Sequence, residues 1–161
     1  MECGDCTECC ELFHVDSKKA TGGNIIETII IDSPAGDLCG YCEKNVGCKV
    51  HEERPKICRD FFCAYAQHEK APVDLRPDVC GIIFEKLDED LFLGTVRPNK
   101  IVSDYGLEQI KAFNKQGYNV VLSKHTTPVP RISCTEGADE FKVLEKFLKI
   151  RREANGKYTD Y

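Results

Sequence analysis

The pattern of apolar and polar positions predicts three strands in the second half of the chain. Residues 81–85 (GIIFE) and 91–96 (LFLGTV) are short apolar runs rich in β-branched and aromatic residues, which are typical of buried strands. The acidic residues 88–90 lie between them, so the two runs predict a β-hairpin. Residues 118–123 (YNVVLS) predict a third strand.

Two helices are predicted in the same part of the chain. Ser103 is a suitable N-terminal cap for a helix over residues 105–116, and Gly117 would stop it. Residues 138–152 place apolar side chains at helical spacing and predict the second helix. These apolar side chains are Phe141, Leu144, Phe147 and Leu148. Residues 126–131 (TTPVPR) predict a loop because prolines interrupt them.

The first part of the chain holds fewer signals of regular structure. Residues 1–13 predict none, and residues 39–48 predict a loop punctuated by glycine. Residues 24–32 (NIIETIIID) predict a strand because they are rich in β-branched side chains. Residues 55–70 (PKICRDFFCAYAQHEK) predict a helix that starts at Pro55.

Cys58 and Cys63 both fall on this last predicted helix, five positions apart. At ~3.6 residues per turn, their side chains would lie about 140° apart around the helix axis. They would not share a face. Either the helix is irregular there, or the two thiols serve different centres.

Together these elements predict an α+β fold. The 161 residues, of which 42% are hydrophobic, are enough to bury a core. Residues 1–70 would form a small cysteine-rich lobe stapled by metal. Residues 71–161 would form an α/β part with a β-hairpin and two helices. The lobe would pack on this part, so that the two make one compact domain.

The net charge of −5 belongs to the cysteine-rich part, because residues 1–63 carry 7 Lys and Arg against 12 Asp and Glu. Such a balance attracts cations and argues against nucleic-acid binding, which needs a basic face. The most apolar stretch, residues 25–31, is short and interrupted by Glu27, so no membrane span is predicted. No signal peptide is predicted either. We therefore expect a cytoplasmic protein that binds neither nucleic acid nor a membrane.

The chain has 11 cysteines, most of which lie in residues 1–63. Thiols stay reduced in the cytoplasm, where they are more often metal ligands or catalytic groups than disulfides. The odd number and the adjacent pair Cys9-Cys10 also argue against a disulfide framework. Three pairs have the C-x-x-C spacing that lets two sulfurs face one metal. They are Cys3/Cys6, Cys6/Cys9 and Cys39/Cys42.

A set of sulfur ligands suits zinc or an iron–sulfur cluster. One zinc site could be formed by Cys3, Cys6, Cys39 and Cys42. The run Cys3-x-x-Cys6-x-x-Cys9 is similar to that of bacterial ferredoxins, although Cys10 breaks the pattern. The candidate sulfurs exceed the needs of one tetrahedral site. We therefore expect two centres, or one cluster with spare thiols.

An ordered motif spans residues 3–63. It reads Cys3-x-x-Cys6-x-x-Cys9-Cys10, then Cys39 and Gly47-Cys48, then Glu53-Arg54-Pro55-x-x-Cys58-Arg59-x-Phe61-x-Cys63. This motif resembles that of the bacterial YkgJ-like cysteine-cluster proteins, which are described as zinc- or iron-chelating domains. Flagellin lysine N-methylases carry a similar motif, and in them it is associated with an iron–sulfur cluster.

The resemblance implies eight metal ligands. They are Cys3, Cys6, Cys9, Cys10, Cys39, Cys48, Cys58 and Cys63. Cys42 stands where the family usually has an apolar residue, so its spacing to Cys39 favours ligation while the family pattern does not. We interpret Cys80, at the start of an apolar strand, as a small buried side chain, and Cys134 as an ordinary thiol.

Charged and aromatic residues near the motif are candidates for supporting roles. Arg54 and Arg59 could neutralise an anionic sulfur-ligated centre, or form surface salt bridges instead. His51 could add a ligand, although an exposed or packing role is the commoner one for such a histidine. An apolar wall that limits water around the site would be formed by Phe61, Phe62 and Tyr65.

We expect a metal-binding protein that holds an iron–sulfur cluster, with the [4Fe–4S] type favoured and a zinc ion as a further option. Its centre would support a redox or protein-modifying reaction on a partner protein. The alternative is a structural zinc module that binds partners without catalysis. A third hypothesis, metal delivery, is motivated by the adjacent Cys9-Cys10 pair and the surplus thiols. No base and nucleophile lie at a diagnostic spacing, so the sequence assigns no catalytic residue.

Overall fold

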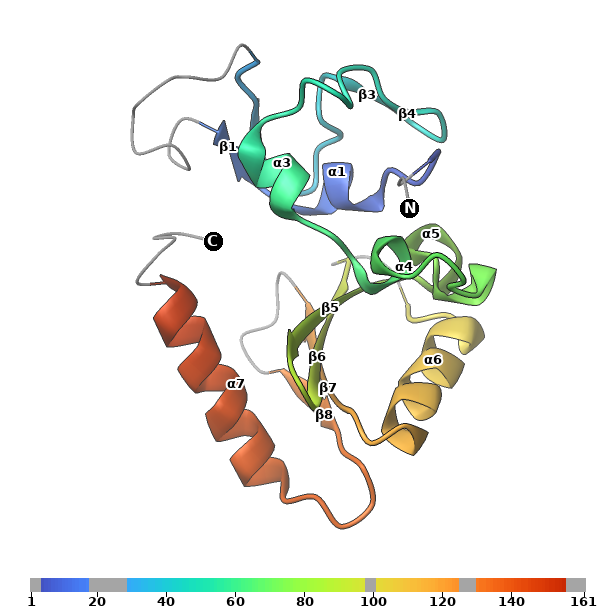
Figure 1. Cartoon of the computed structure of the whole chain (residues 1–161), viewed down its shortest axis with the longest axis vertical. Coiled ribbons are helices and arrows are strands. Elements are labelled where there is room, and N and C mark those ends of the chain that lie inside the picture. Colours follow the sequence, from blue (N-terminus) through green and yellow to red (C-terminus); the bar gives the residue numbers. More distant parts are fainter. Residues whose placement is uncertain (1–3, 18–28, 98–100, 125–129, 156–161) are drawn as a thin grey trace. The chain divides into compact units, whose positions relative to one another are not determined.

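The computed structural model describes residues 4–17, 29–97, 101–124 and 130–155. The chain divides into two compact units, Met1–Phe62 and Cys63–Tyr161 (Figure 1). The division falls a few residues before residue 70, the end of the lobe expected from the sequence. The reason is that Ala64 and Tyr65 already pack in the core of the second unit.

The second unit is built on a four-stranded sheet. Its strands are β5 (Ile82–Asp88), β6 (Leu91–Val96), β7 (Asn119–Lys124) and β8 (Arg131–Ser133), in that spatial order. The β5–β6 and β7–β8 pairs are antiparallel, whereas β6 and β7 are parallel. Helix α6 (Asp104–Lys115) lies in the connection between the two parallel strands, as such a crossover requires. The predicted hairpin, third strand and α+β class are therefore confirmed.

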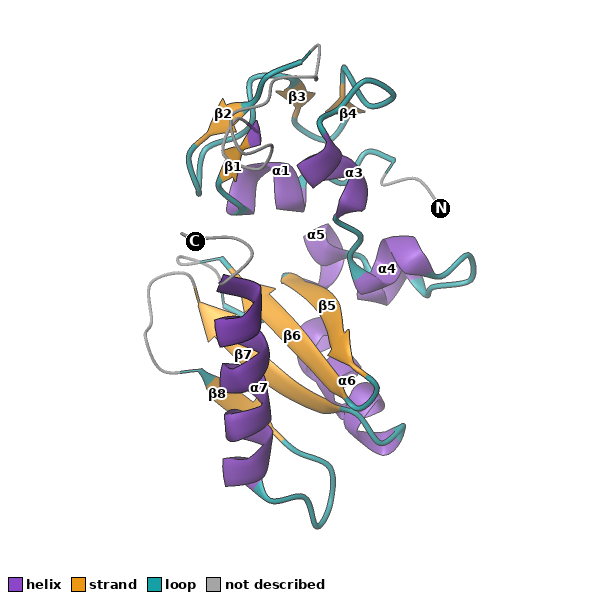
Figure 2. Ribbon diagram, turned by 60° about the vertical axis from the view of Figure 1, so that its left-hand side comes forward, coloured by secondary structure: helices purple, strands orange, loops and turns teal. Residues whose placement is uncertain are grey.

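Both faces of this sheet are covered. Helices α6 and α7 (Glu140–Asn155) lie on opposite sides of the strands (Figures 1 and 2). Every residue of β6 is consequently buried. Phe92 faces the α6 side, where its ring stacks on Phe113 with centroids 4.3 Å apart. The neighbouring Leu91 and Leu93 face the α7 side.

Helix α6 starts and stops within one residue of the predicted bounds, 105 and 116. The Ser103 hydroxyl accepts a hydrogen bond from the Gly106 N–H at 3.1 Å, which is the expected cap. It also donates to the Cys80 carbonyl at 2.8 Å, so the cap fixes α6 against α5 (Pro77–Cys80). Gly117 follows the helix with a φ of 89°, a conformation that favours glycine.

Helix α7 covers the other face, but with a different stripe than the spacing suggested. The buried residues are Val143 and Phe147, and Phe141 is 82% exposed. Lys146 forms an ion pair with Asp88 at 2.7 Å and with Asp90, which ties α7 to the turn of the β5–β6 hairpin.

Other differences from the sequence predictions lie in short elements of the second unit. Strand β8 follows the predicted proline loop and was not expected, because its three residues carry no alternating pattern. Residues 126–129 of that loop lie outside the described residues. The connection before the sheet contains a 3₁₀ turn, Val73–Leu75.

The first unit has little regular structure. Its elements are α1 (Glu8–Leu12), β1 (Val15–Asp16), β2 (Asp32–Ser33), β3 (Cys42–Glu43), β4 (Gly47–Cys48) and α3 (Lys56–Asp60). The strands pair as two small antiparallel ribbons, β1–β2 and β3–β4. Residues 24–28 of the predicted strand lie outside the described residues, and residues 29–31 are not assigned to a strand. Helix α1 was not predicted, and it forms where Leu12 becomes buried.

The prediction of a single helix over residues 55–70 is wrong. Two short helices, α3 and α4 (Ala64–Gln67), replace it, and residues 61–63 between them are extended. The break falls where the chain passes from one unit to the other. Phe61 packs edge-on against Phe13 in the first unit, with ring centroids 5.0 Å apart. A continuous helix would pull it out of that contact.

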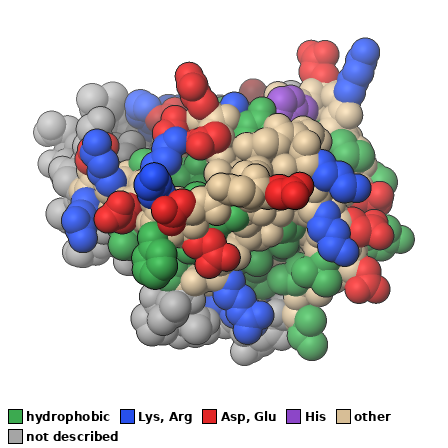
Figure 3. Space-filling view, turned by 90° about the horizontal axis from the view of Figure 1, so that it is seen from below, with side chains coloured by type: hydrophobic (Ala, Val, Ile, Leu, Met, Phe, Trp, Pro, Cys, Tyr) green, Lys and Arg blue, Asp and Glu red, His purple; other side chains and the backbone are tan. Residues whose placement is uncertain are grey.

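Within the described part of the chain, no helix is long and apolar enough to cross a membrane. On the face of the protein drawn in Figure 3, acidic and basic side chains are mixed rather than separated into acidic and basic patches.

Candidate metal centre

Cysteine side chains make up much of the core of the first unit. Its buried cluster consists of Ile31, Cys39 and Cys42, with Cys10 and Cys58 and the partly buried Val15, Ile29 and Leu38 packed against it. Only 6% of Cys39 and 8% of Cys42 is exposed. Thiols from three segments far apart in the sequence therefore meet in one place.

Helix α1 supplies the first of these segments. Cys9 and Cys10 lie within it, and Cys10 is the one that packs in the cluster. The Cys39 N–H donates to the Cys10 carbonyl at 3.0 Å, which fixes the second segment directly on the helix. The Gly36 N–H donates to the Glu11 carbonyl at 2.8 Å and strengthens the same junction.

The small β3–β4 ribbon supplies the second segment. Cys42 on β3 lies directly opposite Cys48 on β4, so both side chains point to the same face of the ribbon. The Cys42 N–H donates to the Cys39 carbonyl at 2.8 Å, which closes the C-x-x-C stretch into a tight turn. A Cβ added at Gly47 would lie 2.8 Å from the Gly4 carbonyl, so the ribbon lies tight against the N-terminal segment.

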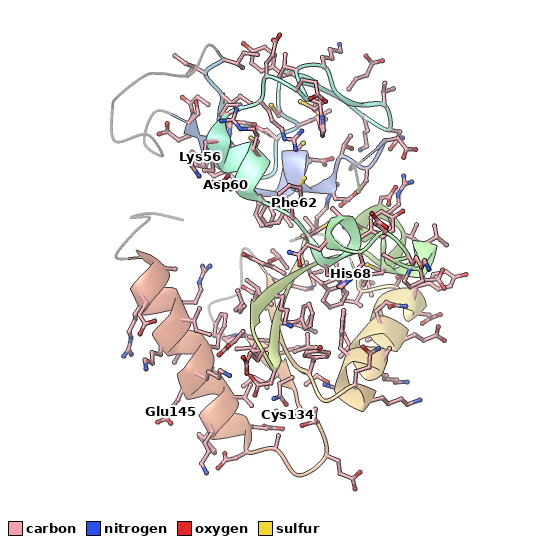
Figure 4. All side chains as sticks on the ribbon, viewed as in Figure 1. Lys56, Asp60, Phe62, His68, Cys134 and Glu145 are labelled. Atoms are coloured by element: carbon pink, nitrogen blue, oxygen red, sulfur yellow. The ribbon has the colours of Figure 1, made fainter. Side chains whose placement is uncertain are left out.

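Helix α3 supplies the third segment. Cys58 lies in its first turn, and its N–H donates to the Pro55 carbonyl at 2.9 Å. Lys56 and Asp60 form an ion pair one turn apart on the same helix (Figure 4). The Arg59 guanidinium donates to the Arg54 carbonyl, and that of Arg54 donates to the His51 carbonyl at 2.8 Å.

The electrostatics show how strongly the thiols of this cluster influence one another. Cys10 is hydrogen-bonded to the thiols of Cys9 and Cys42, and its pKa is raised by the first of these bonds, by burial and by the negative charge that Cys9 would carry. Burial and the neighbouring charge of Cys10 raise the pKa of Cys42 to about 12. The same two causes, in the same order, raise the pKa of Cys58 to about 12. The pKa of Cys39 is raised as well, chiefly by burial.

Arg54 is the cation that acts against this effect. Its guanidinium lowers the pKa of both Cys10 and Cys58. The hydrogen bond from Cys42 also lowers the pKa of Cys10, whereas the negative charge of Cys9 raises it, and the charges of Cys10, Cys39 and Cys48 raise that of Cys58. Ionising several of these thiols at once therefore requires further positive charge in their midst. From the sequence, His51 was considered as an extra ligand; in the structure its ring contacts the carboxylate of the neighbouring Glu52 at 3.3 Å.

The structure brings some of the eight expected ligands together in the cluster and places others elsewhere. The cluster contains Cys10, Cys39 and Cys58, with Cys9 and Cys48 beside it. Cys6 is buried, whereas Cys3 lies outside the described residues. Cys63 is the first residue of the second unit, where the backbone N–H groups of Ala66 and Tyr65 oppose the rise in its pKa that burial causes. Cys42 joins the cluster although the family motif omits it, and its C-x-x-C spacing to Cys39 was the signal.

Two cysteines of the second unit have different surroundings. Cys80 is fully buried in the core, and its thiol donates to the Ile82 carbonyl at 3.1 Å. Cys134 is partly buried beside the α7 side of the sheet and packs against the cluster that contains Leu91.

The expected aromatic wall is different in composition. Phe61 does pack in the first unit, where Phe13 is its partner. Phe62 is 41% exposed (labelled in Figure 4), and Tyr65 packs against the core of the second unit. The Phe13–Phe61 pair was missed because it depends on the extended residues 61–63, where the chain passes from the first unit to the second. The sequence does not show which of the neighbouring rings packs inside the first unit.

The thiol cluster suits a soft metal in its chemistry but is not a closed coordination shell. Among the described residues, no group of three or more His, Cys, Asp or Glu side chains is placed so that it could hold a metal ion. The cysteines described here form no disulfide. Cys10, Cys39, Cys42 and Cys58 pack together in the cluster, and sulfur is the donor that zinc and iron–sulfur clusters take.

Comparisons of the chain with models of protein families, with curated proteins and with solved structures found no match.

Proposed function

We propose that the first unit is a metal-binding lobe whose thiols close around a metal centre. The observation that carries the proposal is the convergence of Cys10, Cys39, Cys42 and Cys58 in the buried cluster, from three separate segments. The second cause of the raised pKa values of Cys42 and Cys58 is repulsion by neighbouring thiolates, which a cation bound among the sulfurs would relieve. Metal ligation would release the thiol protons and remove the repulsion.

The size of the apolar core supports the same proposal. Apart from cysteines, the buried apolar side chains described in the first unit are Leu12, Ile31 and the ring of Pro55. Units of this length with so few buried apolar side chains are usually completed by disulfides or by a structural metal. The described cysteines of the cluster, Cys10, Cys39, Cys42 and Cys58, form no disulfide, so metal is the staple that we propose.

We favour an iron–sulfur cluster of the [4Fe–4S] type, because the lobe holds more thiols than one zinc ion requires. Such a cluster would supply electrons or a Lewis-acidic iron to a redox or protein-modifying reaction on a partner protein. The role of the chain's own residues is to hold the centre, with Arg54 balancing charge and Phe13 and Phe61 packing beside α3. A structural zinc site without catalysis is the alternative, and the deep burial of Cys39 and Cys42 suits it.

Anaerobic purification followed by iron, zinc and sulfide analysis tests the proposal. Brown protein with iron and acid-labile sulfide in equal amounts supports the cluster, whereas colourless protein with stoichiometric zinc supports the structural site. Cys58→Ser should lose the metal, while the matched control Cys134→Ser, in the second unit, should keep it. Wild-type protein that binds neither metal after reconstitution would refute the proposal.

A further inference from the structure

We infer that Cys42 is itself a metal ligand, in contact with Cys10 across the buried cluster. The inference rests on the proposed function and extends it, because the motif that suggested eight ligands leaves Cys42 out. It is carried by the position of Cys42 on its strand, by the turn that precedes it and by the identity of its neighbours.

The strand position directs the Cys42 side chain into the cluster. Cys42 and Cys48 are paired residues of the β3–β4 ribbon, so their side chains share a face. Cys42 is 8% exposed and packs with Cys39 and Ile31, whereas Glu43, next on the strand, is exposed. The inward face of the ribbon therefore presents two sulfurs, of which Cys42 is the more deeply buried.

The preceding turn has the form that metal-binding loops use. The hydrogen bond of 2.8 Å from the Cys42 N–H to the Cys39 carbonyl folds the C-x-x-C stretch back on itself. Such a turn aims two sulfurs at one point, which is why it recurs in zinc knuckles and in cluster loops. The Cys39 N–H is bound to the Cys10 carbonyl, so the turn and helix α1 hold their sulfurs in a fixed relation.

The neighbours of Cys42 distinguish a ligand from a small apolar side chain. Cys80 shows what the latter looks like in this protein, since its sulfur meets the backbone carbonyls of Ile82 and Leu75 in an aliphatic core. The sulfur of Cys42 instead meets the thiol of Cys10, with Cys39 and Cys48 nearby. Cys42 therefore has three thiols near its sulfur, as a metal ligand would.

Metal content of alanine variants tests the inference, because alanine preserves the apolar character of the position. Wild type, Cys42→Ala, Cys58→Ala and Cys134→Ala are reconstituted with zinc and, separately, with iron and sulfide under anaerobic conditions. We expect Cys42→Ala to retain metal more than about tenfold less well against a chelator, since even groups that only orient a ligand affect affinity about 10- to 100-fold. Cys134→Ala should match the wild type.

A second measurement covers the case in which Cys42→Ala fails to fold. The metal-loaded proteins are compared through their thiolate-to-metal absorption with cobalt(II) as the probe ion, in the wild type, Cys42→Ser and Cys134→Ser. This absorption reports the sulfurs that bind the metal, so for each bound cobalt it should fall in Cys42→Ser and stay unchanged in Cys134→Ser.

The outcomes separate the two proposals. This inference alone is overturned if the wild type binds metal and substitution of Cys42 changes neither the retention of metal nor the thiolate-to-metal absorption. Wild type without metal overturns the proposed function and this inference together. Loss of metal in Cys42→Ala and Cys58→Ala, with retention in Cys134→Ala, supports both.

Discussion

Removing the metal should unfold the first unit and leave the second intact. The change is treatment of the reduced, metal-loaded protein with a strong chelator. Burial of Leu12 and Ile31 contributes ~1.5–3 kcal/mol for each side chain. Fixing the backbone costs ~1–2 kcal/mol for each residue, so ordering even roughly ten residues outweighs that gain. Binding of a structural metal contributes ~10–16 kcal/mol to the folding of small metal-stapled domains, which is comparable to the whole stability of a typical domain, so its removal should unfold the unit.

Hydrogen exchange followed by mass spectrometry resolves the two units. In peptides from residues 29–62 we expect protection to fall by at least about 100-fold, which corresponds to ~2.8 kcal/mol of local stability. Peptides from β5 and β6 should keep their protection, because buried apolar side chains on both faces of the sheet stabilise it without metal. A reducing agent throughout prevents disulfides from replacing the metal.

The reasoning would be refuted by a first unit that keeps its protection after the metal has been removed completely. Such a result would mean that the thiols pack well enough as ordinary buried side chains. Parallel loss of protection in β5 and β6 would refute it differently, by showing that the two units fold as one.

Two further predictions concern the second unit. Gly106→Ala should destabilise it by ~1–3 kcal/mol in urea unfolding, because the added Cβ would lie 2.5 Å from the Cys80 carbonyl oxygen and 2.8 Å from Val102. The exposed Glu108→Ala on the same helix should be nearly neutral, and a Gly106→Ala protein as stable as the wild type would contradict the close packing of α5 and α6. Burial raises the pKa of Cys80 from 9.0 to about 11, so the unfolded state loses its proton first and the stability should fall as the pH rises from 9 to 11. Urea unfolding at both pH values should show a smaller fall in stability for Cys80→Ala than for the wild type, and an equal fall in both proteins would reject the assignment.

The elements that the sequence predicts well are those set by local signals. The β5–β6 hairpin follows from two apolar runs around an acidic turn, and the bounds of α6 follow from Ser103 and Gly117. The predicted helix over residues 55–70 failed because its break depends on which unit each side chain joins. Phe61 packs in the first unit and Ala64 in the second, a choice that helical spacing does not encode.

The candidate site shows the same division between local and distant information. The spacing of the cysteines identified them as candidate ligands and predicted that Cys39 and Cys42 would lie close together, because a C-x-x-C turn is a local feature. It could not tell that Cys10 would meet Cys42, and it left open whether Arg54 would act on the thiols or form a surface salt bridge, since these contacts depend on how α1, the ribbon and α3 come together.

The order of the thiols along the chain has a consequence for synthesis. The cluster joins Cys10 near the start of the first unit to Cys58 near its end. A ribosome must therefore finish the whole unit before its core can close, whereas the β5–β6 hairpin needs only its own turn. Under the proposed function, a metal that arrives earlier would meet only part of its ligands, so the timing of metal supply would affect how many chains fold correctly.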